Sequence, residues 1–356
     1  MRILVLGGTG AIGARVCSRL AERGCEVVST TRRNRASREP NVSYARGDAH
    51  DPAFLDKLLA ERWDAIVDFM VWSTGEFRER YRGLLSATDQ YIYTSSYRVY
   101  ADSPVIREDS PRLLDVTDDP AYLTTDEYAL AKARCEDLLF ESGRGNWTVV
   151  RPAVTYDGAV GRLQLGVLES GDWLWRALKG IPVPLPSEML RRQATMSWGG
   201  DVAEMIARLV GNPDALGEAL TVSGSDHMTW GEVAGAYRSV LSSLEVVPCD
   251  LGGFEHAWGN PWQVRYDRMY DRVVDNSKVL AVTGLRQSDL TGMKEGLARE
   301  LSSFLASGRT PAMSGPGLQA RLDRLTGGSP SLRPVARAVG IRGAAKYLAR
   351  RYVFTK

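Results

Sequence analysis

A tyrosine and a lysine stand four residues apart near the middle of the sequence, in the segment Tyr128-Ala129-Leu130-Ala131-Lys132. Residues 126–142 have a helical pattern, and a spacing of four places two side chains on one face of a helix. An adjacent ammonium group stabilises a phenolate, which allows a tyrosine to act as proton donor and acceptor near neutral pH. Alone, such a pair is typical of an ordinary surface helix, so its meaning depends on its neighbours.

Hydroxyl side chains follow the strand expected at 90–95, in Thr94-Ser95-Ser96. Ligands of an open parallel sheet bind at the carboxyl ends of its strands. A hydroxyl there can hold a substrate oxygen, and we count Ser95 as a substrate contact. Together, Ser96, Tyr128 and Lys132 form a plausible hydride-transfer set. Ser96 would orient and polarise the substrate, Tyr128 would be the general acid and base, and Lys132 would activate Tyr128 and bind the nicotinamide ribose.

Three glycines separate the first apolar strand from the first amphipathic helix. Gly7 permits a tight turn, Gly10 permits close approach of a pyrophosphate, and Gly13 permits close packing of helix on strand. The phosphates would face the free N–H groups at the helix start, including those of Ala11 and Ile12, and the positive end of the helix dipole. This position in the chain strongly predicts a dinucleotide site.

The residues after the second strand bear on which dinucleotide is bound. An acid there favours NAD through the ribose 2′-hydroxyl, whereas arginines can bind the 2′-phosphate of NADP. After the second strand this chain has Arg32, Arg33 and Arg35, and no acid occurs there before Glu39. The pattern favours NADP(H) and leaves NAD(H) possible; the alternative is that these arginines form a solvated loop. Asp48, after the third strand, could accept from the adenine amino group or simply form a turn.

Short apolar runs alternate with helical segments over the first 150 residues. Strands are expected at 2–6, 26–30, 42–45, 64–70, 90–95 and 147–150, and helices at 11–23, 52–61, 76–87 and 126–142. Helical crossovers imply a parallel sheet covered on both faces. The sequence therefore predicts an α/β fold, a Rossmann-type doubly wound parallel sheet with a smaller mixed α/β C-terminal substrate lobe.

We expect a dinucleotide-binding domain at 1–155. The segment 156–306 is expected to be mainly the substrate-binding lobe, with some strands and helices returning to the first domain. Residues 307–356 are expected to be a basic extension, and 307–334, rich in Gly, Ser and Pro, a loop or linker.

The composition is that of an ordinary globular chain, with 44% hydrophobic and 25% charged residues among 356. Four cysteines lack CxxC spacing and three histidines lie far apart, so neither a disulfide framework nor a metal site is expected. No run reaches about 18 apolar residues, so no transmembrane segment is expected. No signal-peptide pattern precedes the first strand, and we expect a cytoplasmic protein.

Positive charge is concentrated at the C-terminus. Residues 321–356 hold nine basic residues and one acid, a net +8, so the rest of the chain carries −6 of the total +2. The body is therefore not typical of a nucleic-acid binder, and no nucleic-acid partner is expected. For the tail we favour a solvated helical appendage or subunit contact, with an anionic membrane surface and then nucleic acid as alternatives.

The motifs in their order and spacing resemble the extended short-chain dehydrogenase/reductase family, in its branch of NAD(P)-dependent nucleotide-sugar epimerases, dehydratases and reductases. The resemblance covers about residues 1–300 and rests on Gly7-x-x-Gly10-x-x-Gly13, Asp48, the segment 93–100, Tyr128-x-x-x-Lys132 and Arg151-Pro152. It implies a cofactor across the first 150 residues and a C-terminal lobe closing over a UDP-, dTDP-, CDP- or GDP-linked sugar. It also implies a homodimer and carbohydrate biosynthesis as the setting.

The resemblance adds roles for further residues. Ser96 matches the catalytic serine of the family, and Pro152 matches the position beside the nicotinamide ribose. Arg265, thirteen residues before Lys278, matches an arginine that binds the sugar-nucleotide diphosphate. We add Trp173 as a candidate for stacking on a base or sugar, although a tryptophan in such a place is more often a core residue.

Two departures from the family pattern affect the expected reaction. Dehydratases of the branch have an Asp-Glu pair directly after the serine or threonine, but this chain has Tyr97-Arg98, so 4,6-dehydration is not expected. Val154 replaces an asparagine that usually contacts the nucleotide sugar. A 4-epimerase and a keto-sugar reductase remain equally supported. The alternative is a non-catalytic dinucleotide-binding or sensor protein, or an RNA-binding Rossmann protein.

Overall fold

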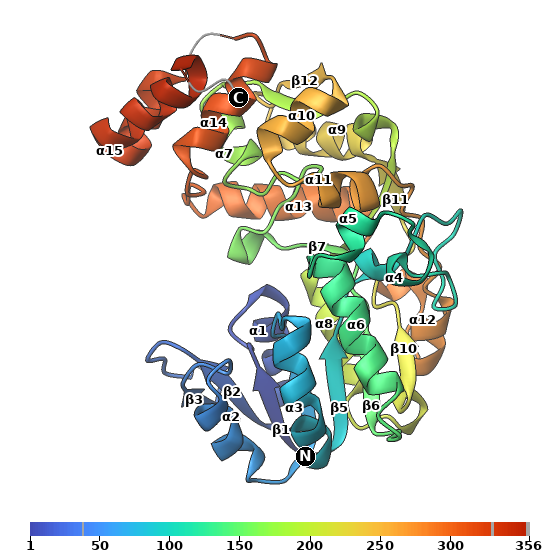
Figure 1. Cartoon of the computed structure of the whole chain (residues 1–356). Helices are drawn as coiled ribbons and strands as arrows, with labels where there is room; N and C mark the ends of the chain where they lie inside the picture. The colour runs from blue at the N-terminus through green and yellow to red at the C-terminus, as the bar shows by residue number, and fades with distance from the viewer. Residues whose placement is uncertain (38, 329–330, 354–356) are drawn as a thin grey trace. The chain divides into compact units, whose positions relative to one another are not determined.

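The computed structural model describes residues 1–37, 39–328 and 331–353, which fall into two units (Figure 1). Unit 1 consists of Met1–Thr155, Ser197–Ser225 and Val274–Thr291. Unit 2 consists of Tyr156–Met196, Asp226–Val273 and Gly292–Lys356. Two segments from the C-terminal half of the sequence therefore belong to the same unit as the glycine-rich turn.

Unit 1 is built on a seven-stranded parallel sheet in the order β10-β6-β5-β4-β1-β2-β3. Its strands are β1 (Arg2–Leu6), β2 (Glu26–Thr31), β3 (Val42–Arg46), β4 (Trp63–Asp68), β5 (Thr88–Thr94), β6 (Trp147–Val150) and β10 (Glu218–Leu220). The strand order reverses between β1 and β4, which makes this point the topological switch of the sheet. Parallel pairing brings the carboxyl ends of β1, β2, β4 and β5 to one edge.

Helices cover both faces of this sheet (Figure 1). The larger helices of unit 1 are α1 (Ala11–Glu22), α2 (Pro52–Leu59), α3 (Thr74–Ser86), α6 (Tyr128–Phe140), α8 (Gly199–Leu209) and α12 (Ser277–Thr283). Alternate residues of β1 face opposite sides: Ile3 and Val5 pack in the cluster of α1, α8 and α12, while Leu4 and Leu6 pack in that of α2, α3 and α6. This arrangement confirms the predicted doubly wound α/β fold.

Short helical turns complete unit 1. They are η1 (Tyr97–Val99), α4 (Leu113–Val116), α5 (Pro120–Leu123), η4 (Pro213–Ala215) and η6 (Gln287–Asp289). Local signals explain where the larger helices begin. Asp51 caps α2 through the Ala53 N–H, with a proline in the first turn, and a reciprocal capping box joins Ser73 and Glu76 at the start of α3.

Unit 2 contains smaller sheets of mixed direction. Strand β8 (Val183–Pro186) is parallel to β12 (Val246–Cys249), and β9 (Gln193–Trp198) is antiparallel to β11 (His227–Thr229). Its helices are α7 (Trp173–Ala177), α9 (Trp230–Val240), α10 (Leu251–Trp258), α11 (Pro261–Gln263), α13 (Met293–Ala306), α14 (Pro316–Leu325) and α15 (Leu332–Leu348). Short turns are η2 (Gly158–Val160), η3 (Met189–Arg191), η5 (Val264–Arg268) and η7 (Ala349–Val353), and β7 (Val154–Tyr156) runs across the boundary between the units.

The sequence-based expectation of a loop over 307–334 is wrong for much of this segment. Helix α14 forms there because Ala320 and Leu322 are buried against the rest of unit 2. The tail is also more than a solvated appendage, since Val335 and Tyr347 of α15 are buried too. In the described residues, no helix is both long enough and apolar enough to cross a membrane.

Candidate active site

The glycine-rich turn joins the end of β1 to the start of α1 in a conformation that needs glycine. Gly7 has φ +72°, in the left-handed region that favours glycine. Its N–H donates to Oγ1 of Thr30 in β2 at 2.9 Å, and the Gly10 N–H donates to the Gly7 carbonyl at 3.1 Å. The turn is therefore fixed to the neighbouring strand at the carboxyl edge of the sheet.

The glycines differ in what surrounds them. A Cβ on Gly13 would lie 2.8 Å from Cα of Gly8, so Gly13 allows α1 to pack directly on the turn. A Cβ on Gly8 would lie 2.5 Å from Oγ of Ser29, a requirement that the sequence analysis missed although Gly7-Gly8 signalled it. Gly10 meets nothing nearer than 3.5 Å and leaves room for a ligand.

The first turn of α1 offers backbone donors beside this space. Gly10 is the N-cap of α1 and provides no side-chain capping bond. The N–H groups of Ala11 and Ile12 are in the first helical turn, where no intrahelical acceptor exists. These donors and the positive helix end suit the pyrophosphate of a dinucleotide.

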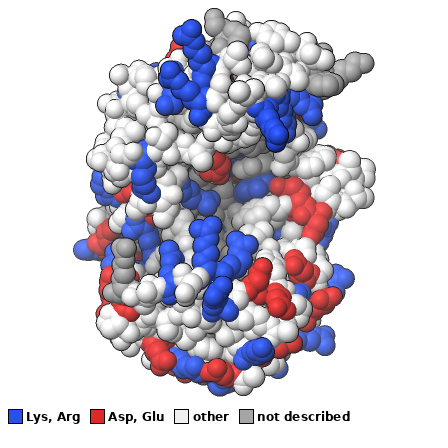
Figure 2. All heavy atoms as spheres, turned by 90° about the vertical axis from the view of Figure 1, so that its left-hand side faces the viewer, with Lys and Arg blue, Asp and Glu red and all other residues white. Residues whose placement is uncertain are grey.

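Arginines lie beside the glycine turn because β2 ends there. Arg32 and Arg33 directly follow β2, and Thr30, which binds Gly7, is two residues before Arg32. Within the described part of the chain, no hydrogen bond or ion pair holds the Arg32 or Arg33 guanidinium group. Lys and Arg side chains gather on this face of unit 1 (Figure 2). Asp48 lies after β3, exposed, and its Oδ1 accepts from the His50 N–H at 3.1 Å.

Lys132 is held by two backbone carbonyl groups. Its Nζ donates to the carbonyl of Thr94 at 2.6 Å and to that of Met70 at 3.1 Å, and only 2% of the residue is exposed. The two acceptors are the last residue of β5 and a residue just after β4. An ammonium group has three donors, so one remains for a ligand or for Tyr128.

Tyr128 begins α6, and two cations lie near its ring. Nζ of Lys132 is 5.8 Å from the centroid of its ring, and Cζ of Arg98 is 5.2 Å from it. Arg98 also forms an ion pair with Glu127 at 2.7 Å. Glu127 is the N-cap of α6 and accepts from the Ala129 N–H at 2.8 Å. Sequence reasoning missed Arg98 and Glu127 as site residues, although the replacement of the Asp-Glu pair pointed at this position.

A pocket of about 340 Å³ adjoins Tyr128 and Lys132. It is lined by these two residues with Val71, Trp72, Ser73, Glu76, Asp126 and Ala131. All of them belong to unit 1, in the loop after β4, in α3, and in or just before α6. The pocket therefore lies at the carboxyl end of β4, where ligands of this architecture bind.

The hydroxyl groups at the end of β5 have different partners. Oγ of Ser96 accepts from the Arg98 N–H at 3.2 Å and caps η1. Oγ of Ser95 and Oγ1 of Thr94 are buried and have no partner in the described residues. Buried hydroxyls normally find a partner, so these two orphaned atoms fit a site whose ligand is a polar molecule. Together with the open space at Gly10, they show that the residues present suit a nicotinamide dinucleotide.

The sequence analysis missed Asp68, a buried carboxylate at the end of β4. Asp68 ends β4 and accepts from the Tyr91 hydroxyl at 2.6 Å, the Trp72 indole at 2.7 Å and the Met70 N–H at 2.8 Å. Burial raises the pKa of Asp68, and the hydrogen bonds from Tyr91 and Trp72 oppose that rise. Because Asp68 fixes Met70, it also fixes one of the two carbonyls that hold Lys132.

The Arg151-Pro152 motif is bonded to segments that carry site residues. The carbonyl of Pro152 accepts from the Tyr97 N–H at 3.0 Å, next to Ser96. The Arg151 guanidinium forms two 2.8 Å bonds to the Glu136 carboxylate, both side chains being buried. This pair joins the residue that directly follows β6 to α6, the helix that carries Tyr128.

Two predicted substrate contacts, Trp173 and Arg265, belong to unit 2. Trp173 is fully buried, its indole N–H donates to the Leu163 carbonyl at 2.8 Å, and its ring stacks on Tyr237 at 4.6 Å. These are the contacts of a core residue, so Trp173 is left out of the proposed site. Arg265 is half exposed and forms a two-pronged ion pair with Glu255.

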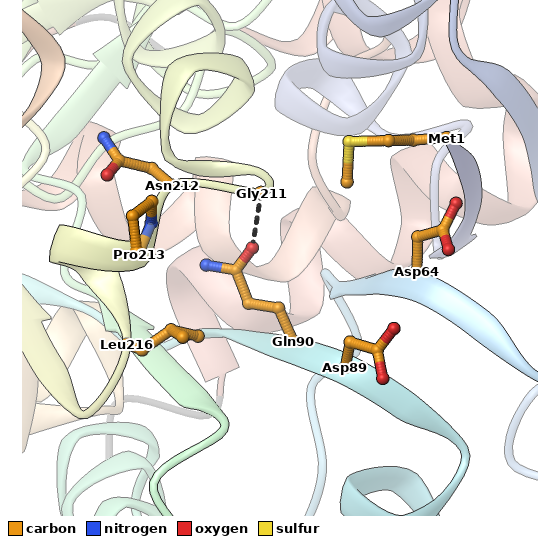
Figure 3. A pocket seen from close by; sticks show the side chains of 8 residues that line it. All are labelled: Met1, Asp64, Asp89, Gln90, Gly211, Asn212, Pro213 and Leu216. Carbon is orange, nitrogen blue, oxygen red and sulfur yellow. Dashed lines mark hydrogen bonds between the residues drawn. The ribbon is translucent and has the colours of Figure 1, made fainter.

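A second pocket of unit 1 lies at the opposite edge of the sheet (Figure 3). It has a volume of about 380 Å³ and is lined by Met1, the starts of β4 and β5, and the loop after α8. Gln90 projects into it, but its amide is already bonded to the Gly211 N–H, the Thr148 hydroxyl and the Leu209 carbonyl. Since strands begin at this edge, the pocket is separate from the candidate active site.

Comparison with known protein families gives a match for the N-terminal part of the chain. Residues 3–156 match the NAD dependent epimerase/dehydratase family. This segment holds the glycine turn, the β5 hydroxyls and the Tyr-Lys pair, so the match to the family covers the candidate active site.

Two curated relatives are similar in sequence. The chain is 28% identical over 254 residues to the chloroplast stem-loop binding protein of 41 kDa b of Arabidopsis thaliana, an alignment that covers 66% of this chain and 62% of that protein. It is 37% identical over 79 residues to the UDP-glucose 4-epimerase of Streptococcus mutans, covering 20% of this chain and 24% of the epimerase. The alignments thus span less than two thirds of either relative.

Solved structures share the fold over most of the chain. The epimerase Mth375 of Methanothermobacter thermautotrophicus superposes with a TM-score of 0.67 at 15% identity, covering 86% of this chain and 93% of that one. The UDP-glucose 4-epimerase of Thermus thermophilus in complex with NAD gives 0.63 at 21% identity, covering 86% and 100%. MoeE5 in complex with UDP-glucose and NAD gives 0.62 at 18% identity, covering 87% and 100%. At these identities the likeness shows the fold.

Proposed function

We propose that this protein is an NAD(P)-dependent oxidoreductase that acts at a carbinol or keto carbon of a nucleotide-activated sugar, with Tyr128 as the general acid and base. One observation carries the proposal. The Lys132 ammonium group donates to the carbonyls of Met70, just after β4, and Thr94, the last residue of β5, and lies beside Tyr128; the hydroxyls of Thr94 and Ser95 at the same strand end have no partner among the described residues. An isolated surface Tyr-Lys pair would not bury its lysine in this way.

A bound nicotinamide supplies a hydride acceptor or donor; the chain supplies the proton transfer and the positioning. The Tyr128 phenolate accepts the proton of the sugar hydroxyl during oxidation, and the phenol returns one during reduction. The Ser96 hydroxyl binds the same substrate oxygen and is held in place by the Arg98 N–H. Lys132 stabilises the phenolate and would donate its third N–H to the ribose of a bound nicotinamide dinucleotide.

For the cofactor we propose a preference for NADP(H). The family that residues 3–156 match is described as NAD dependent, and two of the structural relatives named above were solved with NAD. What supports the phosphorylated form is the free state of Arg32 and Arg33 beside the glycine turn, since two guanidinium groups match a 2′-phosphate dianion. Asp48 and Pro152 would contact the adenine and the nicotinamide ribose.

The proposed substrate is a UDP-, dTDP-, CDP- or GDP-linked sugar, with Arg265 as a candidate diphosphate contact. The sugar nucleotides named with two structural relatives support this class. The reaction is a 4-epimerisation or a keto-sugar reduction, because both use the same three residues. The absence of carboxylates at Tyr97 and Arg98 argues against 4,6-dehydration. We expect a homodimer and a cytoplasmic location.

The test uses purified full-length protein with a panel of nucleotide sugars and their 4-keto derivatives. Oxidation of NADPH in proportion to substrate indicates a reductase, and interconversion of sugars without net change in dinucleotide absorbance indicates an epimerase. Tyr128→Phe is expected to abolish turnover and to retain dinucleotide binding. Tyr81→Phe, at a buried tyrosine of α3, is the matched control. Full turnover by Tyr128→Phe, or failure to bind either dinucleotide, would refute the proposal.

A second candidate is a Rossmann protein that binds RNA rather than a sugar. The observation in its favour is the 28% identity to a protein named for stem-loop binding, together with the unpaired arginines at the end of β2. An electrophoretic shift assay with a stem-loop RNA separates the two. RNA binding that NADPH displaces, with no turnover on the sugar panel, would favour this candidate.

A further inference from the structure

The last helices of unit 2 carry exposed apolar side chains among basic ones. We propose that this surface docks on an anionic lipid bilayer and holds the protein at a membrane interface. The exposed residues of this surface form the tail face, which consists of Arg337, Val339, Ile341, Arg342, Lys346, Leu348, Arg350, Tyr352 and Val353.

The inner side of the tail is fixed by a buried polar cluster. The Arg176 guanidinium donates to Asp323 of α14 at 2.6 Å and to Gln319 at 2.9 Å, and all three side chains are buried. Asp323 also accepts from the Tyr347 hydroxyl of α15 and from the Ser331 N–H. A buried arginine requires such partners, so α14 and α15 are firmly attached and their outer side is well defined.

The outer side of α15 is apolar along one line. Gly340 has φ +69° and breaks the helix, so a new helical segment begins at Ile341. Ile341, Ala345 and Leu348 follow at a spacing of four and three, which places them in one row. Ile341 is 89% exposed and Val353 69% exposed. Aliphatic side chains this exposed are a marker of an interaction surface when they occur together.

The charge around this row has one sign. The segment 331–353 has six basic residues and no acidic residue. Arg342 and Lys346 are one turn apart and next to the apolar row, on the side away from buried Ala344 and Tyr347. Positive charge beside an apolar stripe is the composition of helices that lie in the headgroup region of anionic membranes.

A pocket beside the first half of α15 is also lined by basic and apolar side chains. It has a volume of about 390 Å³, and of the described residues that line it the charged ones are Lys179 and Arg337. Trp175, Met313 and Val339 give it apolar walls. Two cations and apolar walls in one pocket suit the phosphate and upper acyl carbons of one phospholipid.

The exposed side chains favour lipid over nucleic acid. Single-stranded nucleic acid is bound by aromatic platforms among basic residues. The row of α15 contains Ile341, Ala345 and Leu348, which offer no stacking surface, and the ring of Tyr352, the aromatic residue of the tail face, already faces the Arg351 guanidinium. Transfer of an isoleucine or leucine side chain from water into the acyl region is favourable by the hydrophobic effect. We therefore commit to an anionic bilayer as the partner.

The test is sedimentation of the full-length protein with vesicles. We expect at least tenfold stronger binding to vesicles of equal parts phosphatidylcholine and phosphatidylglycerol than to pure phosphatidylcholine. Ile341→Ser and the double variant Arg342→Glu/Lys346→Glu are each expected to weaken binding about tenfold. Matched controls are Val116→Ser, at a valine of unit 1 that is 56% exposed, and Arg78→Glu on the exposed side of α3. Both controls should bind like the parent protein.

Three outcomes would overturn the proposal. The first is equal binding to neutral and anionic vesicles, or to neither. The second is unchanged binding by the tail-face variants, whose folding is checked by thermal denaturation. The third is retention of a stem-loop RNA by the parent protein that Arg342→Glu/Lys346→Glu abolishes while Ile341→Ser does not, since this would assign the surface to nucleic acid.

Discussion

The Arg98 guanidinium lies over the ring of Tyr128, 5.2 Å from its centroid. The same side chain forms an ion pair with Glu127, the residue that caps the helix at whose first position Tyr128 stands. Lys132 approaches the ring from one turn further along. The phenol that we propose as acid and base thus has two cations near its ring, one from η1 and one from α6.

The first prediction concerns Arg98. Arg98→Gln removes both the contact with the Tyr128 ring and the ion pair with Glu127, so the first turn of α6 should lose its fixed position. We expect kcat to fall about tenfold or more while KM for the dinucleotide changes little, because misplacement of an acid-base group mainly affects the chemical step. Arg98→Lys should recover part of the loss. An unchanged kcat in Arg98→Gln would show that Arg98 does not position Tyr128.

Lys132 should matter for both binding and stability. Lys132→Met leaves the Thr94 and Met70 carbonyls without their donor. One unpaired buried carbonyl costs about 1–3 kcal/mol. Because the two carbonyls are only part-buried, the free energy of unfolding in urea should drop by about 1–3 kcal/mol in total. Dinucleotide affinity and kcat should fall together. Lys57→Met, at an exposed lysine of α2, is the control that should alter none of the three.

The dinucleotide preference should depend on Arg32 and Arg33. The double variant Arg32→Ser/Arg33→Ser is expected to weaken NADPH binding about tenfold or more and to leave NADH binding nearly unchanged, since charge-assisted bonds to the 2′-phosphate are lost. Dissociation constants from the fluorescence of the bound reduced dinucleotides measure this. Arg62→Ser serves as the control. A parent protein that already prefers NADH would contradict the prediction directly.

The buried Arg151–Glu136 pair should be essential for stability. Glu136→Gln leaves a buried guanidinium without its counter-charge, which costs about 3–5 kcal/mol. Equilibrium unfolding in urea should show this loss. Glu141→Gln, at the exposed end of the same helix, should be nearly neutral. A loss in Glu136→Gln no greater than in the control would mean that the pair contributes little.

The capping box of α3 should make stability depend on acid pH. Bonds from the backbone N–H and hydroxyl of Ser73 lower the pKa of Glu76 to about 2, against an ordinary value near 4.3. A depressed carboxyl pKa stabilises the folded state above the ordinary value, and this contribution is lost as the pH falls from about 4 towards 2.

Glu76→Ala should therefore be less stable than the parent protein at neutral pH by about 1 kcal/mol, a typical value for a helix cap. The difference between the two should narrow as the pH falls through this window. Urea unfolding at a series of pH values measures it. A difference that stays constant down to pH 2 would show that the Glu76 charge has no part in it.

The sequence alone determined the local parts of the site. Gly7 and Gly13 could be assigned because a left-handed turn and a close helix contact admit only glycine. The alternation of apolar runs predicted the doubly wound sheet, since hydrophobic periodicity is set by the faces that strands and helices bury. The spacing of Tyr128 and Lys132 predicted that both side chains share a helix face.

Only the tertiary structure decided what these residues touch. The clamp on Lys132 is made by Met70 and Thr94, and its support by Asp68, which lie 62, 38 and 64 positions away. Trp173 was named as a candidate ligand platform although a core position was the commoner case, and its burial decided for the core. Residues 316–325 form helix α14 although the surrounding sequence resembles a linker, and the buried Arg176 guanidinium donates to Asp323 of this helix, 147 residues later in the sequence. Such contacts depend on which distant segments pack together, and local composition does not encode that choice.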